Sequence, residues 1–281
     1  MQVELSDLIE AHSRADMRTQ ISGLWLSRVT TTEPEYSLTD PMLVVMARGG
    51  KRLLLGDRMY EYRAGQCLLV TTGLPVSGHF FDTPSLGVAV TLRPEAIAPL
   101  LLAAPPVPRS TGAAAIATFE TGPDLLDAVT RLVRLLDQPR DIEVLAPLFE
   151  REILWRLLTG PHGDVLRQIA LADSSLAHIN RAITWLRDNY AEPMRVDDLA
   201  RLAGMSTSAF HRHFRDVTAM SPLQFQKRLR LQEARALLLA RPDDVAGVGH
   251  LVGYDSPSQF SREYRRLFGA PPGQDAARLR A

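Results

Sequence analysis

The chain has 281 residues, enough for about two domains, and its 32 basic and 32 acidic residues cancel, so the total charge indicates no partner. A single cysteine, Cys67, excludes an intrachain disulfide and fits a protein of the reducing cytoplasm. The sequence has no run of about 18 apolar residues and no signal-peptide core at its start, so we expect no membrane partner.

Residues 1–15 have the pattern of a short amphipathic helix, and residues 20–92 then consist of short apolar runs. Turn residues separate these runs, notably Gly49-Gly50 and Gly56-Asp57. Such spacing predicts antiparallel hairpins in a small β-sandwich or jelly-roll barrel. The apolar interior of such a barrel suits a small organic effector. The candidate lining residues, each also explicable as core or surface, are Trp25, Arg28, Tyr60, Tyr62 and His79.

Residues 122–160 follow a proline-rich segment and have the period of two amphipathic helices. The apolar face of the first helix consists of Leu125, Val129, Leu132 and Leu136. Two uses of this face stay open, namely covering the barrel and pairing with a second subunit in a homodimer. We therefore expect an effector-binding and dimerisation domain over residues 1–160 and a linker over residues 161–177.

Residues 178–281 contain no strand pattern and form the third expected part of the chain. The basic residues are concentrated toward this end. Residues 1–173 hold 16 Lys and Arg against 21 Asp and Glu, whereas residues 174–281 hold 16 against 11. The surplus is a modest indication of a polyanionic partner, and an ordinary solvated surface explains it equally well.

This region also resembles itself. The segment from Leu202 to Pro222 matches the segment from Leu251 to Pro272, with an offset of 49 residues that becomes 50 after one insertion. Each copy has a helix, a glycine turn, a capping serine and a second helix with two aromatic residues four apart. The repetition predicts two helix-turn-helix units, over about residues 196–217 and 244–267, joined by one long helix.

Polar and cationic residues remain on the outer face of each second helix. The pattern places His211 on that face and His213 about 200° away around the helix. Two histidines so placed cannot readily share a metal ion, so we expect no metal site and no cofactor here. The residues expected at a DNA interface are Ser206, Thr207, Ser208, His211, Arg212, Arg215, Ser256, Ser258, Gln259, Arg262 and Arg265.

The stretches VDDLARLAGMSTSAFHRHFRDVTAMSPLQF and VGYDSPSQFSREYRRLFGAPP resemble the DNA-binding domain of the AraC/XylS family, over about residues 178–272. The segments LLLGDRMYEYRAGQCLLVTTGLPVSG and LAPLFEREILWRLLTGPHG are similar to the effector-binding arm of one subgroup of that family. The resemblance implies an α+β two-domain fold, with a cupin-like barrel and flanking helices before an all-α domain that contains both helix-turn-helix units. It also implies a transcription regulator, usually an activator, that binds double-stranded DNA, RNA polymerase and a small effector.

By position in the resemblance, the candidates for base contacts are Ser208, His211, Arg212, Ser258, Gln259 and Arg262. Thr207, Arg215, Ser256 and Arg265 more plausibly hold phosphates. The sequence departs from the family pattern in two places. Gly247 and Gly249 weaken the first helix of the second unit by roughly 1 kcal/mol each relative to alanine. The stretch PPGQDAARLR lacks the aromatic residue and the nearby arginine that usually follow the final prolines.

Two other functions stay open at this point. Cupin-like barrels also house metalloenzymes, but residues 20–92 contain a single histidine, His79, and the chain lacks the common catalytic motifs. We therefore expect no enzyme. The remaining alternative is a DNA-binding protein whose barrel serves only for dimerisation and binds no effector.

Overall fold

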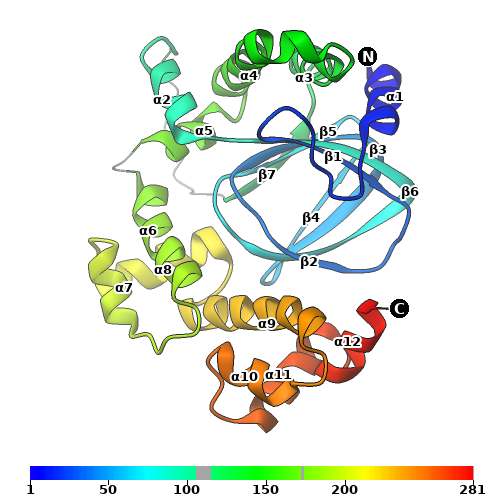
Figure 1. Cartoon of the computed structure of the whole chain (residues 1–281). Helices are drawn as coiled ribbons and strands as arrows, with labels where there is room; N and C mark the ends of the chain where they lie inside the picture. The colour runs from blue at the N-terminus through cyan, green and yellow to red at the C-terminus, as the bar shows by residue number, and fades with distance from the viewer. Residues whose placement is uncertain (106–114, 172–173, 281) are drawn as a thin grey trace. The chain divides into compact units, whose positions relative to one another are not determined.

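The computed structural model describes residues 1–105, 115–171 and 174–280. The chain separates into two compact units, one of Met1–Glu35 with Thr39–His178 and one of Tyr36–Leu38 with Ile179–Ala281. An antiparallel sheet dominates the first unit, and helices form nearly all of the second (Figure 1). This arrangement confirms the predicted α+β two-domain fold class.

The first unit is built on strands that pair in the order β1-β6-β3-β5-β7, with β4 on β3. The pairings of these six strands are antiparallel, as in Leu24 opposite Val90 and Gly50 opposite Arg63. The described residues contain the strands β1 (Leu24–Val29), β2 (Glu35–Leu38), β3 (Met42–Leu55), β4 (Arg58–Arg63), β5 (Gln66–Val70), β6 (Pro75–Thr91) and β7 (Ile116–Glu120), of which β2 falls largely in the second unit.

Two details of the sheet differ from the prediction. Gly49-Gly50 is not a turn, because both glycines lie inside β3, where its register with β6 shifts twice beside Arg48. Gly49 has φ +74°, and a Cβ there would lie 2.3 Å from Ser85 Oγ, so this irregularity needs glycine. The sheet also extends beyond residue 92, since β7 pairs with β5.

Helices cover the sheet of the first unit, and α1, α3 and α4 gather at one end of it (Figure 1). Leu125, Val129, Leu132 and Leu136 are each at most 8% exposed in the single chain. The apolar face that these four residues form is therefore part of the core of this unit. Of the two predicted uses of that face, its burial supports covering the barrel. The helices are α1 (Gln2–His12), α2 (Pro94–Leu101), α3 (Pro123–Arg134), α4 (Ile142–Thr159) and α5 (Gly163–Ala170), with 3-10 turns at Leu135–Asp137 and Pro139–Asp141.

The expected linker over residues 161–177 is largely helical. Helix α5 occupies its first half, and α6 (Ser175–Asp188) begins at its end. Residues 172 and 173 of the expected linker lie outside the described residues. The compact units divide between His178 and Ile179.

The second unit consists of helices around a central helix α9 (Figure 1). Serine caps start α8, α9 and α11, and glycines with positive φ precede α8 and α11 in the two turns. After α6, the helices are α7 (Val196–Leu202), α8 (Thr207–Thr218), α9 (Pro222–Ala240), α10 (Val245–Leu251), α11 (Pro257–Phe268) and α12 (Pro272–Arg280).

The two departures from the family pattern each have a structural counterpart. A Cβ on Gly249 would lie 2.9 Å from the Phe260 ring, so glycine permits α10 and α11 to pack closely. The last helix docks through Asp275, which is fully buried and accepts hydrogen bonds from Arg235 and Tyr264. A carboxylate therefore anchors α12 where the pattern has an aromatic residue.

Candidate nucleic-acid interface

The two helix-turn-helix units have the same turn geometry. In the first, the amide of Gly204 bonds to the carbonyl of Arg201 and the amide of Met205 to that of Ala200. In the second, Gly253 bonds to His250 and Tyr254 to Gly249 in the same way. Gly204 has φ +65° and Gly253 has φ +89°. The repeat seen in the sequence is therefore a repeat of backbone structure.

Aromatic side chains orient the second helix of each unit. Phe210 and Phe214 on α8 are fully buried, and their ring centroids are 5.3 Å apart. Phe260 and Tyr264 on α11 are fully buried in the same way, with centroids 5.6 Å apart. Because residues four apart share one helix face, burial of these rings turns the opposite face of each helix outward.

The predicted contact residues lie on these outward faces. On α8 and its cap, Ser206, Thr207, Ser208, His211, Arg212 and Arg215 are all exposed. On α11, Ser258, Arg262 and Arg265 are exposed, whereas Ser256 and Gln259 are partly buried. Neither Arg212 nor Arg262 is turned inward, so each helix presents a cationic ridge suited to a groove of duplex DNA.

Several of the predicted residues also have local partners. As helix caps, the Ser206 and Ser256 hydroxyls accept hydrogen bonds from the backbone amides of Ala209 and Gln259, respectively. The Thr207 hydroxyl donates to Asp197 Oδ1 at 2.9 Å and so joins α8 to α7. These residues therefore stabilise the turn through their hydrogen bonds, and they also lie on the outward side.

Two residues near this face were absent from the sequence prediction. Glu263 on α11 is 8% exposed and accepts a hydrogen bond from the predicted contact residue Gln259. Lys227 on α9 forms an ion pair with the same carboxylate at 2.9 Å. The i, i+4 spacing of Gln259 and Glu263 was a sequence signal for the contact between them. Lys227, in contrast, is 36 residues from Glu263 in the sequence.

The connecting helix α9 has 19 residues and is about 28 Å long at 1.5 Å per residue. Its Arg230 donates to carbonyl oxygens of Tyr190, Ala191 and Gly253 at 2.7, 3.1 and 2.6 Å. Burial lowers the pKa of this guanidinium, although neighbouring carboxylates and Tyr254 oppose the effect. One side chain thus joins the loop before the first unit to the turn of the second.

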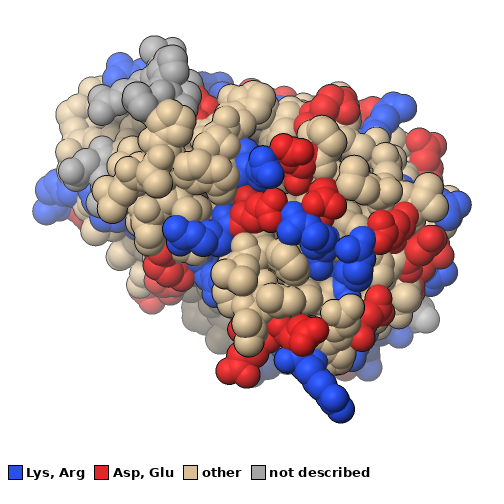
Figure 2. Space-filling model, turned by 90° about the horizontal axis from the view of Figure 1, so that it is seen from above, with Lys and Arg blue, Asp and Glu red and all other residues tan. Residues whose placement is uncertain are grey.

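A different distribution of charge marks the first unit. Figure 2 views the molecule from above and shows basic and acidic side chains interspersed on that face. The first unit contains several ion pairs, among them Arg131 with Glu152, Arg93 with Glu150, and Arg134 with Glu4. Alternating charges produce no field of one sign, so this face lacks the electrostatic character of a nucleic-acid interface.

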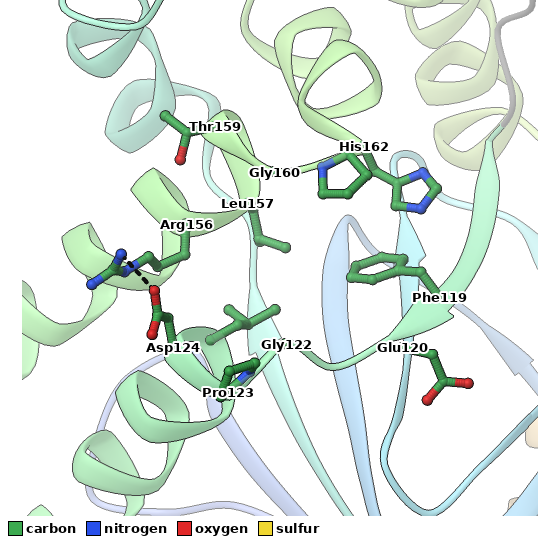
Figure 3. Close-up of a pocket in the computed structure, with 12 residues that line it drawn as sticks. Phe119, Glu120, Gly122, Pro123, Asp124, Arg156, Leu157, Thr159, Gly160 and His162 are labelled. Carbon is green, nitrogen blue, oxygen red and sulfur yellow. Dashed lines mark hydrogen bonds and ion pairs between the residues drawn. The ribbon is translucent and has the colours of Figure 1, made fainter.

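The first unit has a cavity of about 470 Å³ between β7, the start of α3 and the α4–α5 turn (Figure 3). On one side, the ring centroids of Phe119 and His162 are 4.5 Å apart, and the two ring planes are inclined by 31°. On the other side Arg156 Nη1 is 3.0 Å from Asp124 Oδ2, and Leu157 lines the space between. A lining of aromatic and apolar side chains with a few polar groups is typical of small-molecule sites.

None of the five predicted effector residues lines this cavity. Trp25 and Arg28 are exposed on β1, and Tyr60 and His79 are partly buried on β4 and β6. Tyr62 alone is buried, and that burial raises the pKa of its phenol above the ordinary range. The structure therefore does not bring the five residues together at the cavity of Figure 3.

Within residues 1–105, 115–171 and 174–280, no group of three or more His, Cys, Asp or Glu side chains is arranged to hold a metal ion. Over the same residues, no helix combines the length and the apolar character needed to traverse a bilayer. Cys67 is buried against Thr121, and burial raises the pKa of its thiol to about 12.

Comparison with known proteins links both units to one family. The N-terminal region of AraC-type transcriptional regulators matches residues 20–165, and a helix-turn-helix domain matches residues 199–278. The transcriptional activator RhaS of Escherichia fergusonii is 31% identical over 160 residues, which cover 54% of this chain and 56% of RhaS. RhaS of Escherichia coli is 28% identical over 151 residues, or 53% of each protein. The chain thus spans about half the length of the curated relatives it matches.

Solved structures match more of the chain at lower identity. An apo form of ToxT from Vibrio cholerae has a TM-score of 0.58 and 10% identity, covering 92% of this chain and 99% of ToxT. ToxT bound to an unsaturated fatty acid has a TM-score of 0.55 and 11% identity, covering 92% and 97%. At these identities the likeness establishes the fold.

Proposed function

Because this chain belongs to the AraC/XylS family of transcription regulators, and is therefore a regulator rather than an enzyme, we propose that it binds duplex DNA through α8 and α11. One observation carries this proposal. Two helices with the same preceding turn each bury an aromatic pair and present an exposed arginine at the same repeat position, Arg212 and Arg262. Two such helices on one connector suit consecutive major-groove segments about 34 Å apart.

The contact residues divide into two roles. Ser208, His211, Arg212, Ser258, Gln259 and Arg262 contact base edges, with arginine suited to guanine and glutamine to adenine. Thr207, Arg215, Ser256 and Arg265 hold phosphates and set the register. The activator role and a contact with RNA polymerase belong to the same proposal, supported by the activator name that RhaS carries. A cytoplasmic location belongs to the same proposal.

The first unit senses a small organic effector in this proposal. Support comes from the cavity of Figure 3, whose volume of about 470 Å³ suits an organic molecule of moderate size. It also comes from ToxT, whose solved structure contains an unsaturated fatty acid. An effector that binds one conformation better than another shifts the population of the regulator, which is how binding changes transcription.

A homodimer completes the proposal, with an interface different from the predicted one. Leu125, Val129, Leu132 and Leu136 are buried within the chain. The exposed apolar residues of α4 are Val144 and Leu148, at 68% and 57%, and their spacing of four places them on one helix face. A second copy of this chain that packs α4 on α4 would cover both.

The DNA-binding part is tested by selecting duplexes from a random library with the full chain and titrating the selected site. Arg262→Ala should cost about 1–3 kcal/mol on the selected site and relax the preference at one base position. Arg265→Ala should weaken binding to all duplexes alike and reduce the salt slope by about 1. Failure to select any sequence motif would refute the proposed function.

A further inference from the structure

The side chain of Gln259 is directed away from the helix end by a carboxylate. We propose that Glu263 is a specificity-determining positioning residue, which holds the Gln259 amide ready to bind an adenine edge in the major groove. This inference rests on the proposed function, since it concerns how α11 recognises bases. It assigns to Glu263 an effect on sequence preference although Glu263 itself contacts no base.

The local sequence favours another conformation of Gln259. Gln259 follows the cap residue Ser256 by three positions, which is the capping-box spacing. In α9 the same pattern forms the complete box, where Ser221 accepts the amide of Gln224 and Gln224 Oε1 accepts the amide of Ser221 at 2.9 Å. In α11 the Ser256 hydroxyl accepts the Gln259 amide, but the Gln259 side chain donates to Glu263 instead.

Glu263 can hold Gln259 because its own carboxylate is fixed from two sides. Lys227 Nζ lies 2.9 Å from Glu263 Oε1, and the Tyr254 hydroxyl donates to Oε2 at 2.9 Å. Burial alone would raise the pKa of this carboxyl, but the bonds from Lys227, Gln259 and Tyr254 hold it below its ordinary value. The carboxylate is thus ionised and oriented, and Gln259 Nε2 meets it at 3.2 Å.

The hydrogen-bonding capacity of the amide remains sufficient for adenine. A glutamine amide has two N–H donors and one carbonyl acceptor. The contact with Glu263 uses one donor, which leaves the other donor and Oε1 for the bidentate pair with adenine N7 and N6. The same contact settles which end of the amide is the donor, so the side chain need not select its orientation on binding.

The helix-turn-helix fold does not require this pair. At the offset of 50 residues, Gln259 corresponds to Ala209 and Glu263 corresponds to His213. The first unit forms the same turn and buries the same aromatic positions with alanine and histidine there. The pair is therefore an addition to the second unit, located beside the exposed Ser258 and Arg262.

Without Glu263, we expect Gln259 to complete the capping box with the Ser256 amide. Its Oε1 would then be occupied at the helix end and withdrawn from the groove. Glu263→Ala should therefore lower adenine preference at one position from about tenfold to below about twofold, as in Gln259→Ala. Preferences at the other positions should stay as in the unmodified chain.

The experiment selects duplexes from a random library with the full chain and with Gln259→Ala, Glu263→Ala and Tyr254→Phe. Tyr254→Phe is the matched control, because it removes the bond to Glu263 Oε2 but leaves Lys227 on Oε1, the oxygen that Gln259 contacts, and so destabilises the same cluster without touching Gln259. It should lower thermal stability and leave the sequence motif intact. Glu263→Met, which keeps a side chain of similar length but has no oxygen to accept the Gln259 amide, replaces Glu263→Ala if the alanine variant does not fold.

The inference is overturned if the Glu263 variant keeps the preference that Gln259→Ala loses, if Gln259→Ala loses none, or if Tyr254→Phe loses it equally. Each of these results leaves a sequence motif for the unmodified chain, so the proposed function would survive. Absence of any motif for the unmodified chain would instead remove the proposed function and this inference with it.

Discussion

Nη1 of Arg230 donates to the carbonyl oxygen of Gly253 at 2.6 Å, which ties the connecting helix to the turn of the second helix-turn-helix unit. The same guanidinium holds the carbonyl oxygens of Tyr190 and Ala191. Gly253 has φ +89°, and a Cβ there would lie 2.3 Å from the Ala191 oxygen. The glycine that makes the turn therefore also allows the loop after α6 to approach it.

Replacing Arg230 with methionine should destabilise the second unit. Several carbonyl oxygens would lose a charged donor, and we expect the free energy of unfolding to fall by about 3 kcal/mol. Urea unfolding followed by circular dichroism measures the change. Arg195→Met is the control, because Arg195 is an exposed arginine of the same unit. Equal midpoints for both variants would contradict the role given to Arg230.

Gly249→Ala should destabilise the chain even though alanine is the better helix former. The new Cβ would lie 2.9 Å from Cδ1 of the buried Phe260 ring, and overpacking of this kind costs about 1–3 kcal/mol. Gly273→Ala is the matched comparison, because its nearest neighbour is Val245 at 3.9 Å. We expect that variant to be neutral or more stable by up to about 1 kcal/mol. Thermal unfolding of both variants would disprove the packing argument if Gly249→Ala were the more stable.

The anchor of α12 should make stability depend on pH in the acid range. Burial alone would raise the pKa of the Asp275 carboxyl, but the bonds from Arg235 and Tyr264 hold it below its ordinary value. A carboxyl whose pKa is lowered by folding stabilises the protein above the unfolded value of about 4, and the stabilisation is lost as pH falls through the folded value.

Asp275→Asn tests this dependence. At pH 7 the variant should be less stable by about 3 kcal/mol, since it leaves the partly buried Arg235 without its charged partner. Between pH 6 and pH 3 its free energy of unfolding should fall less steeply than that of the unmodified chain. Urea unfolding at each pH gives both curves, and parallel curves would show that Asp275 does not titrate as argued.

The proposed dimer predicts opposite outcomes for a double substitution on α4 and a single substitution on α3. Val144→Glu with Leu148→Glu should lower the mass in solution and leave the fold intact, because both side chains are exposed. Leu132→Glu should unfold the first unit, because Leu132 is fully buried. Light scattering after size-exclusion chromatography gives the mass, and circular dichroism reports the fold. An unchanged mass for the α4 variant would place any interface elsewhere.

The sequence by itself determined the second unit in detail. The capping serines, turn glycines and aromatic pairs act over a few residues, so the local pattern was enough to predict both helix-turn-helix units. The outward face of each second helix followed from helical periodicity, and the exposure of Arg212 and Arg262 agrees with it.

Tertiary structure decided what depends on partners distant in the sequence. Gly49-Gly50 has a turn pattern, yet both lie within β3 because β6 pairs along it. The face containing Leu132 suited a barrel cover or a dimer, and packing within the first unit buried it. Gln259 has the spacing of a capping box, but its side-chain amide donates instead to Glu263. That carboxylate is held by Lys227 from another helix. Local patterns specify which groups need a strand-pairing, packing or hydrogen-bond partner. The folded chain determines which partner lies close enough to interact with each group.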